Sequence, residues 1–171
     1  DGKKVSKSDK NYVKAVEEIN RHGADLLRLF VCQLDYEGDM GASPKLIQEF
    51  GDKYRKIRNT LRYLLSNLYD YAPAATPIDV PSGSLDGWIS HELDKMIGEV
   101  TAAYDRYELH NVFRGLYDFC NVQISAVYGN AMKDRLYCEA PDSPLRRRAQ
   151  QVMHRCVVAL TKLLAPMLVF T

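Results

Sequence analysis

Residues 43–68 read SPKLIQEFGDKYRKIRNTLRYLLSNL, and the pattern within this stretch indicates the class of fold. The stretch opens with Ser43 and Pro44, which are an N-cap residue and a proline at the first helical position, where its missing N–H is not needed. Apolar side chains then recur at steps of three and four residues, the spacing of one face of an α-helix: Tyr54, Ile57, Leu61, Leu64, Leu65 and Leu68. The stretch therefore predicts a long amphipathic helix that ends near Tyr71.

The same spacing returns in three later parts of the chain. It predicts helices over residues 85–100, 112–127 and 144–164, and Ser143 followed by Pro144 repeats the start signal for the last of them. Residues 72–84 contain three prolines and are predicted to be a linking loop. Four long amphipathic helices joined by loops predict an all-α fold, an antiparallel helix bundle.

Composition limits the kinds of protein that the chain can be. Its 171 residues are 46% hydrophobic, which suits one domain, or a domain with an appendage, and a sizeable core. Its net charge is only +1, so any attraction to nucleic acid must come from local clusters of charge. The most apolar run, residues 157–170, is shorter than the ~20 residues of a membrane span, so we expect no membrane partner. Four scattered cysteines without a CxxC pair indicate reduced thiols in a cytoplasmic protein.

The chain before Ser43 has a different character. Residues 2–11 form a basic, polar loop, and two short helices are predicted on either side of Gly23, with Asp25 at the positive end of the second. The loop offers ammonium, hydroxyl and backbone N–H groups, which suit a phosphate ligand. A short run of lysines is also typical of solvated surface, so composition alone leaves both interpretations open.

The run Lys4-Val5-Ser6-Lys7-Ser8 resembles the KMSKS signature of class I aminoacyl-tRNA synthetases, with Val5 in place of the methionine. Residues 17–31 look like the segment that follows this loop in the isoleucyl, valyl and leucyl enzymes. Three further stretches are similar to the bacterial isoleucyl-tRNA synthetase family: residues 35–39, 54–65 and 133–143. The resemblance extends over nearly the whole chain.

The resemblance implies a fragment of a larger ligase that joins isoleucine to tRNA(Ile). Residues 1–42 would hold the signature loop and a stem-contact segment, and residues 43–171 would be a helical anticodon-binding domain truncated at its C-terminal end. The family's Rossmann catalytic core, its editing domain and its zinc-bearing C-terminal part have no counterpart here. We therefore expect the fragment alone not to be catalytic and not to bind zinc.

In the full-length enzyme, the resemblance implies that the loop closes over ATP, which is bound with Mg. Lys7 would be the catalytic residue, and the ATP phosphates would be bound by Lys4, Ser6, Lys7 and Ser8. The sequence departs from the family at Asp9-Lys10, where Leu-Gly is usual, and the loss of glycine removes easy access to positive φ.

Two groups of arginines are candidates for tRNA binding. Arg55, Arg58 and Arg62 are spaced to form one stripe on the first long helix, although they could instead pair with acidic neighbours across the bundle. Arg146, Arg147 and Arg148 are denser, but consecutive helical residues point about 100° apart, so not all three can face one ligand. No metal site is expected, because the alternating acids of residues 35–39 lack the glycine and glutamate of an EF-hand.

Two other interpretations remain open at this stage. The first is the equivalent fragment of a valyl- or leucyl-tRNA synthetase, which would have the same chemistry and a different amino acid. The second is a stand-alone helical protein-interaction module, whose apolar C-terminal end binds a partner helix.

Overall fold

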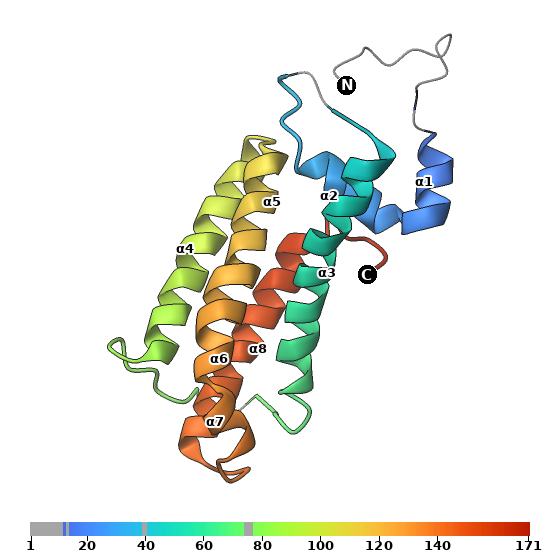
Figure 1. Ribbon diagram of the computed structural model, residues 1–171. Helices are drawn as coiled ribbons and strands as arrows, with labels where there is room; N and C mark the ends of the chain where they lie inside the picture. The colour runs from blue at the N-terminus through green and yellow to red at the C-terminus, as the bar shows by residue number, and fades with distance from the viewer. Residues whose placement is uncertain (1–11, 13, 39–40, 74–76) are drawn as a thin grey trace.

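The computed structural model describes residue 12 and residues 14–38, 41–73 and 77–171. Within these ranges the chain is helical and contains no strand, which confirms the predicted all-α bundle (Figure 1). The helices are α1 (Ala15–His22), α2 (Ala24–Cys32), α3 (Pro44–Ser66), α4 (Leu85–Asp105), α5 (Leu109–Asp118), the π-helix η1 (Phe119–Tyr128), α6 (Gly129–Ala131), α7 (Lys133–Tyr137) and α8 (Pro144–Leu164).

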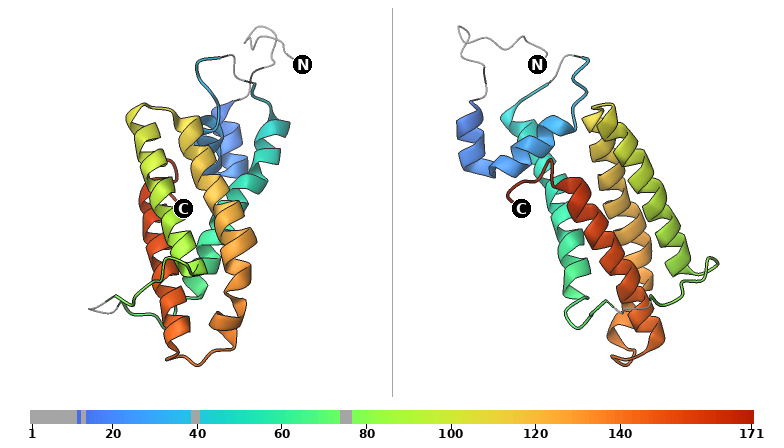
Figure 2. Two further views of the ribbon diagram at one scale, coloured as in Figure 1. Left: turned by 90° about the vertical axis from the view of Figure 1, so that its left-hand side faces the viewer. Right: turned by 180° about the vertical axis from the view of Figure 1, so that it is seen from behind.

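Four long rods lie side by side in the bundle: α3, α4, the continuous run α5–η1–α6, and α8 (Figures 1 and 2). The short helices α1 and α2 lie at one end of the bundle, and α7 lies at the opposite end (Figure 1). Since α3 has 23 residues and rises 1.5 Å per residue, these two ends are about 35 Å apart. The last residues of the chain return to the end where α2 lies (Figure 2).

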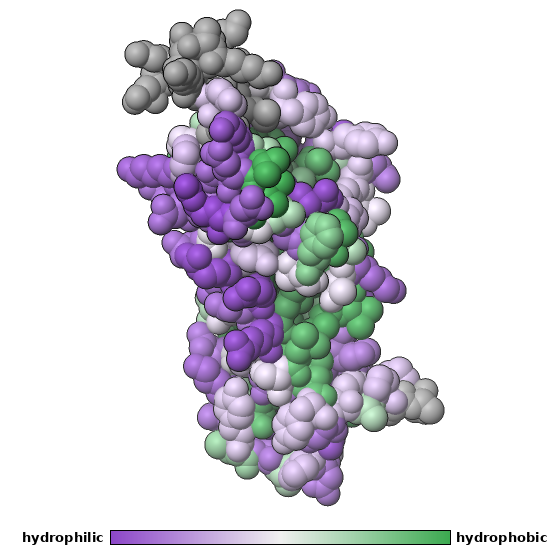
Figure 3. All heavy atoms as spheres, turned by 90° about the vertical axis from the view of Figure 1, so that its right-hand side faces the viewer, coloured by the Kyte–Doolittle hydropathy of each residue, from purple (hydrophilic) through white to green (hydrophobic). Residues whose placement is uncertain are grey.

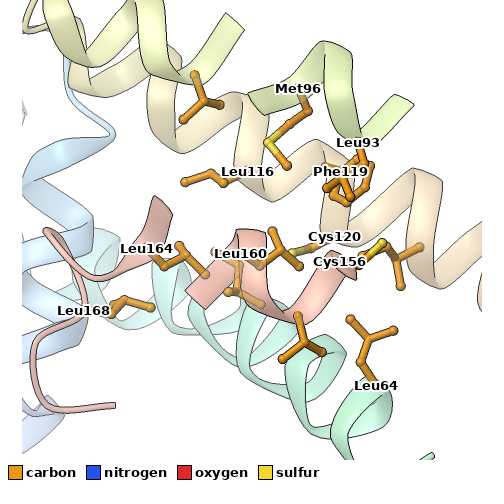
Figure 4. Packing of buried hydrophobic residues seen from close by; sticks show 14 of the residues in the cluster. Leu64, Leu93, Met96, Leu116, Phe119, Cys120, Cys156, Leu160, Leu164 and Leu168 are labelled. Carbon is orange, nitrogen blue, oxygen red and sulfur yellow. The ribbon is translucent and has the colours of Figure 1, made fainter. Parts of the chain in front are cut away.

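The core consists of apolar side chains from all four rods (Figure 4). Leu64 of α3, Leu93 of α4, Leu116 of α5 and Leu160 of α8 are each fully buried. At the α2 end, Phe30 contacts Phe50 with ring centroids 5.6 Å apart, so α2 shares an apolar contact with α3. None of the helices in the described part of the chain is long and apolar enough to cross a membrane.

Both helix starts that the Ser-Pro pairs predicted are confirmed. The Ser43 hydroxyl accepts a hydrogen bond from the Leu46 N–H at 3.2 Å, and α3 begins at Pro44. Helix α8 begins at Pro144, although the Ser143 side chain makes no capping bond. Helix α3 ends at Ser66, earlier than the predicted Tyr71, because the residues after Ser66 turn to meet α8.

The predicted helix over residues 112–127 is present, but its winding changes. Helix α5 gives way at Phe119 to the wider π-helix η1. The hydroxyl of Thr60 on α3 is 3.5 Å from the Cys120 carbonyl and 3.0 Å from the Ser125 hydroxyl, so polar contacts join α3 to this segment.

Gly23 separates α1 from α2, as predicted. Its φ of 87° lies in the left-handed half of conformational space, which a residue with a Cβ rarely adopts. Because no neighbouring atom lies within 4 Å of the place that a Cβ would take here, the backbone conformation rather than crowding requires glycine.

Candidate nucleic-acid interface

The predicted phosphate-binding residues Lys4, Ser6, Lys7 and Ser8 lie outside the described part of the chain. The residues that can be placed are the two groups of arginines.

The arginine stripe on α3 is exposed along its length. Arg55 pairs with Asp52 one turn earlier on its own helix, rather than with an acid across the bundle. The guanidinium of Arg58 lies 5.8 Å from the centre of the Tyr54 ring, within the range of a cation–π contact. Among the described residues, no carboxylate lies within ion-pair distance of Arg58 or Arg62. Both arginines border a groove between α3 and the end of α8.

The cluster at the start of α8 is spread by the helix, as its spacing predicted. The Arg146 side chain is only 5% exposed, and its two terminal nitrogens donate to the Asp70 carboxylate at 2.7 and 3.0 Å. Arg147 is half-buried and donates to the Asp70 carbonyl at 2.7 Å. Arg148 is also partly buried, and its Nε has no hydrogen-bond partner among the described residues. Arg146 thus joins α8 to the turn that follows α3, and its contact with tRNA stays a prediction.

Asp70 is the centre of this network. Besides the two bonds from Arg146, its carboxylate accepts a hydrogen bond from the Gln150 amide at 2.7 Å. The same Gln150 nitrogen donates to the Asn67 carbonyl at 2.9 Å. The bonds from Arg146, and then the one from Gln150, lower the pKa of Asp70 to about 2, despite the opposing effect of burial. Asp70 is therefore ionised at neutral pH and firmly bound.

A second carboxylate, this one fully buried, stabilises the same end of the bundle. Asp86, at the start of α4, is fully buried and accepts bonds from the Tyr128 hydroxyl and from Arg135 Nη1, each at 2.7 Å. Burial, and then the charge of Asp86, raises the pKa of the Tyr128 hydroxyl, which therefore stays protonated and donates. These bonds join α4, η1 and α7.

Two exposed tyrosines at this end were not predicted from the sequence. The residues are Tyr69, which is 82% exposed, and Tyr137, which is 64% exposed. Each adjoins a residue that Arg146 binds, since Arg146 bonds to Asp70 and to the carbonyl of Leu136. The sequence carried only a weak signal for them, because tyrosine at the end of an apolar face is more often part of the core. We name Tyr69 and Tyr137 the tyrosine pair.

In the described part of the chain, no group of three or more His, Cys, Asp or Glu side chains is placed to hold a metal ion. The described surface offers exposed guanidinium charge on α3 and exposed aromatic rings at the α7 end. These are the two kinds of group that bind the phosphates and the unpaired bases of RNA.

Comparisons with known proteins agree with this chemistry. Residues 86–171 match the family model of the anticodon-binding domain of tRNA ligases. Residues 1–43 match the model of class I tRNA synthetases of the I, L, M and V group.

Several bacterial isoleucine–tRNA ligases are similar to the chain along its whole length. It is 46% identical to the enzyme of Symbiobacterium thermophilum over 171 residues, which are 99% of this chain and 18% of the relative. The identity is 43% to the enzyme of Desulfitobacterium hafniense and 46% to that of Kosmotoga olearia, again over 99% of the chain and 18% of each relative. The chain thus spans about a fifth of the length of these relatives. Since the first family model covers half of its residues, the chain belongs to the anticodon-binding domain family of tRNA ligases.

Proposed function

We propose that the chain binds tRNA(Ile) as one part of an isoleucine–tRNA ligase. The observation that carries this proposal is the match of residues 86–171 to the anticodon-binding domain model. The names of the relatives favour isoleucine over the valine or leucine alternatives. Such a ligase acts in translation, so we also propose a cytoplasmic location.

We further propose that two parts of the chain bind different ligands. Residues 1–42 would bind ATP and the acceptor stem, and residues 43–171 would bind the anticodon side of the tRNA. The match of residues 1–43 to the synthetase model supports this boundary. In the complete enzyme, ATP would be bound with Mg, and its phosphates by Lys4, Ser6, Lys7 and Ser8. Lys7 would stabilise the charge that develops on the phosphates as the adenylate forms. The catalytic and editing domains would be supplied by the rest of the enzyme.

The tyrosine pair is our candidate for contact with unpaired tRNA bases. It lies at the α7 end, about 35 Å along α3 from the end where α1 and α2 lie (Figure 1). A tRNA that reaches the N-terminal segment with its acceptor stem would extend along the bundle toward that far end. Exposed aromatic rings suit bases there, because every base has a face that can stack on them.

Titration of tRNA(Ile) against the chain tests this proposal. Tyr69→Ala should weaken binding about tenfold, since stacking on one base contributes about 1–3 kcal/mol. Affinity should also fall as salt rises, because phosphate contacts release counterions. Fluorescence anisotropy with labelled tRNA measures both effects.

Tyr107→Ala is the matched control. Tyr107 is 76% exposed but lies in the turn between α4 and α5, at the other end of the bundle from Tyr69. Its loss should leave the affinity within about twofold of the unchanged chain. Equal losses in both variants, or no detectable preference for tRNA(Ile) over random RNA, would count against the proposal.

A further inference from the structure

The groove beside Arg58 and Arg62 has an apolar floor. It has a volume of about 880 Å³ and is lined by Leu61 and Leu65 of α3, Leu164 of α8, and Leu168 and Val169 of the chain that follows α8. Leu65 and Val169 are each 56% exposed. Figure 3 shows hydrophobic side chains gathered in a band down this side of the molecule. We call this feature the α3–α8 groove.

One wall of the α3–α8 groove is held in place by α2. The Asp25 carboxylate, which is buried, accepts hydrogen bonds from the N–H groups of Val169 and Phe170 at 3.0 Å each. Arg28 donates to the carbonyls of Pro166 and Met167 at 2.8 and 3.0 Å. Helix α2 thus holds the residues after α8 through both their N–H groups and their carbonyl groups. A preformed wall favours binding, because the groove loses little conformational entropy when a partner binds.

The chemistry of the groove fits an amphipathic helix better than it fits RNA. Leucine and valine side chains neither stack on bases nor pair with phosphates. Polar groups of RNA placed over this floor would therefore lose water without gaining hydrogen bonds. A helix with an apolar face buries the floor, as in other helix-in-groove complexes. The guanidinium groups of Arg58 and Arg62 border the same floor and have no carboxylate partner among the described residues, so they select a helix with acidic residues along one edge.

We propose that the α3–α8 groove is the docking site for an amphipathic, acidic-edged helix of the same polypeptide, from the segment that corresponds to the one after the matched region in the ligase relatives. The chain covers only 18% of its relatives' length, so such a ligase has ample sequence to supply the helix. A second copy of the chain fits less well, because a two-fold contact through this groove brings the same arginines of both copies together. The source of the helix rests on the proposed function, whereas its chemistry rests on the groove.

The test uses a synthetic peptide of about 25 residues, enough for one helix and its flanks. The peptide copies the sequence that follows the matched region in the Symbiobacterium thermophilum ligase. Calorimetry should show saturable binding to the chain that weakens with added salt. Leu65→Asp should weaken it by about tenfold or more, because the substitution removes apolar contact area and places an acid against the acidic edge. Arg62→Glu should weaken it as well.

Val122→Asp is the matched control, since Val122 is 46% exposed on η1 and does not line the α3–α8 groove. It should bind the peptide like the unchanged chain. Val169→Asp tests the opposite wall of the groove and guards against a folding defect in Leu65→Asp, while circular dichroism reports the helix content of each variant. Absence of peptide binding, or equal binding by Leu65→Asp, overturns the proposal. A dimer that is detected by sedimentation and dissociated by Leu65→Asp also overturns the proposal.

Binding of tRNA(Ile) by the same variants separates the two proposals. Leu65→Asp should lose the peptide and keep the tRNA, whereas Tyr69→Ala should do the reverse. If the chain binds the peptide but no tRNA, the proposed function fails and the docking site stands. If Leu65→Asp and Arg62→Glu instead weaken tRNA binding and leave the peptide unaffected, the α3–α8 groove belongs to the RNA interface and the docking proposal is wrong.

Discussion

Asp70 is the residue through which the end of α3 is bound to the start of α8. Its pKa of about 2 in the folded chain lies below the ordinary value of 3.8, so ionisation of Asp70 favours folding. Asp70→Asn should therefore lower the free energy of unfolding at pH 7 by about 2 kcal/mol, the equivalent of that shift. Urea denaturation followed by circular dichroism measures the difference.

The pH dependence of that difference in unfolding free energy tests whether Asp70 stabilises the fold through its charge. Above pH 4 the carboxylate is ionised in both the folded and the unfolded chain, and its full contribution is present. As pH falls from about 4 to about 2, the unfolded chain takes up the proton first, so the contribution declines and the variant approaches the unchanged chain. Asp142→Asn, an exposed aspartate in the turn before α8, should show no such convergence. If the difference in unfolding free energy between Asp70→Asn and the unchanged chain stays constant down to pH 2, Asp70 does not act through its charge.

At the scale of single elements, α2 depends on residues at the far end of the chain. Asp25→Asn should lower the free energy of unfolding by about 2 kcal/mol, because a charge-assisted acceptor of two backbone N–H groups becomes a neutral amide. Hydrogen exchange of the Val169 and Phe170 amides should accelerate more than tenfold, while the amide of Leu93 in α4 changes no more than global stability requires. Uniform acceleration at all three amides would mean that α2 and the final residues do not form a separately opening unit.

Local contacts and long-range contacts differ in how well the sequence predicts them. The Ser-Pro pairs predicted where α3 and α8 begin, since a proline at the first helical position acts locally at both starts and the Ser43 cap adds to it at α3. The spacing of Arg146–Arg148 predicted that the three side chains would diverge, but not that Arg146 would turn inward, because its partner Asp70 is 76 residues away. Asp25 was placed correctly at the start of a helix, yet its partners lie 144 and 145 residues further along. Long-range polar contacts of this kind leave no periodic trace in the sequence.

At the scale of the whole molecule, two buried cysteines test whether the bundle opens as one unit. Burial raises the pKa of Cys120 on η1 and of Cys156 on α8 to about 12 each, and both side chains lie in the shared core (Figure 4). Since the thiolate is the reactive form, both should resist labelling until the core opens. Cys138 is exposed and should react at once. Labelling at pH 8, followed by peptide mass spectrometry, gives a rate for each thiol.

If the rods separate together, Cys120 and Cys156 should be labelled at equal, slow rates. Because Asp70→Asn alters no thiol but weakens the α3–α8 contact, it should raise both rates by about 30-fold, the equivalent of 2 kcal/mol in the opening equilibrium. The rate of Cys138 should not change, which makes that residue an internal control. Faster labelling of Cys156 than of Cys120 would mean that α8 separates from the core before the other helices. The α3–α8 groove would then open with α8 and would not be a fixed surface of the folded bundle.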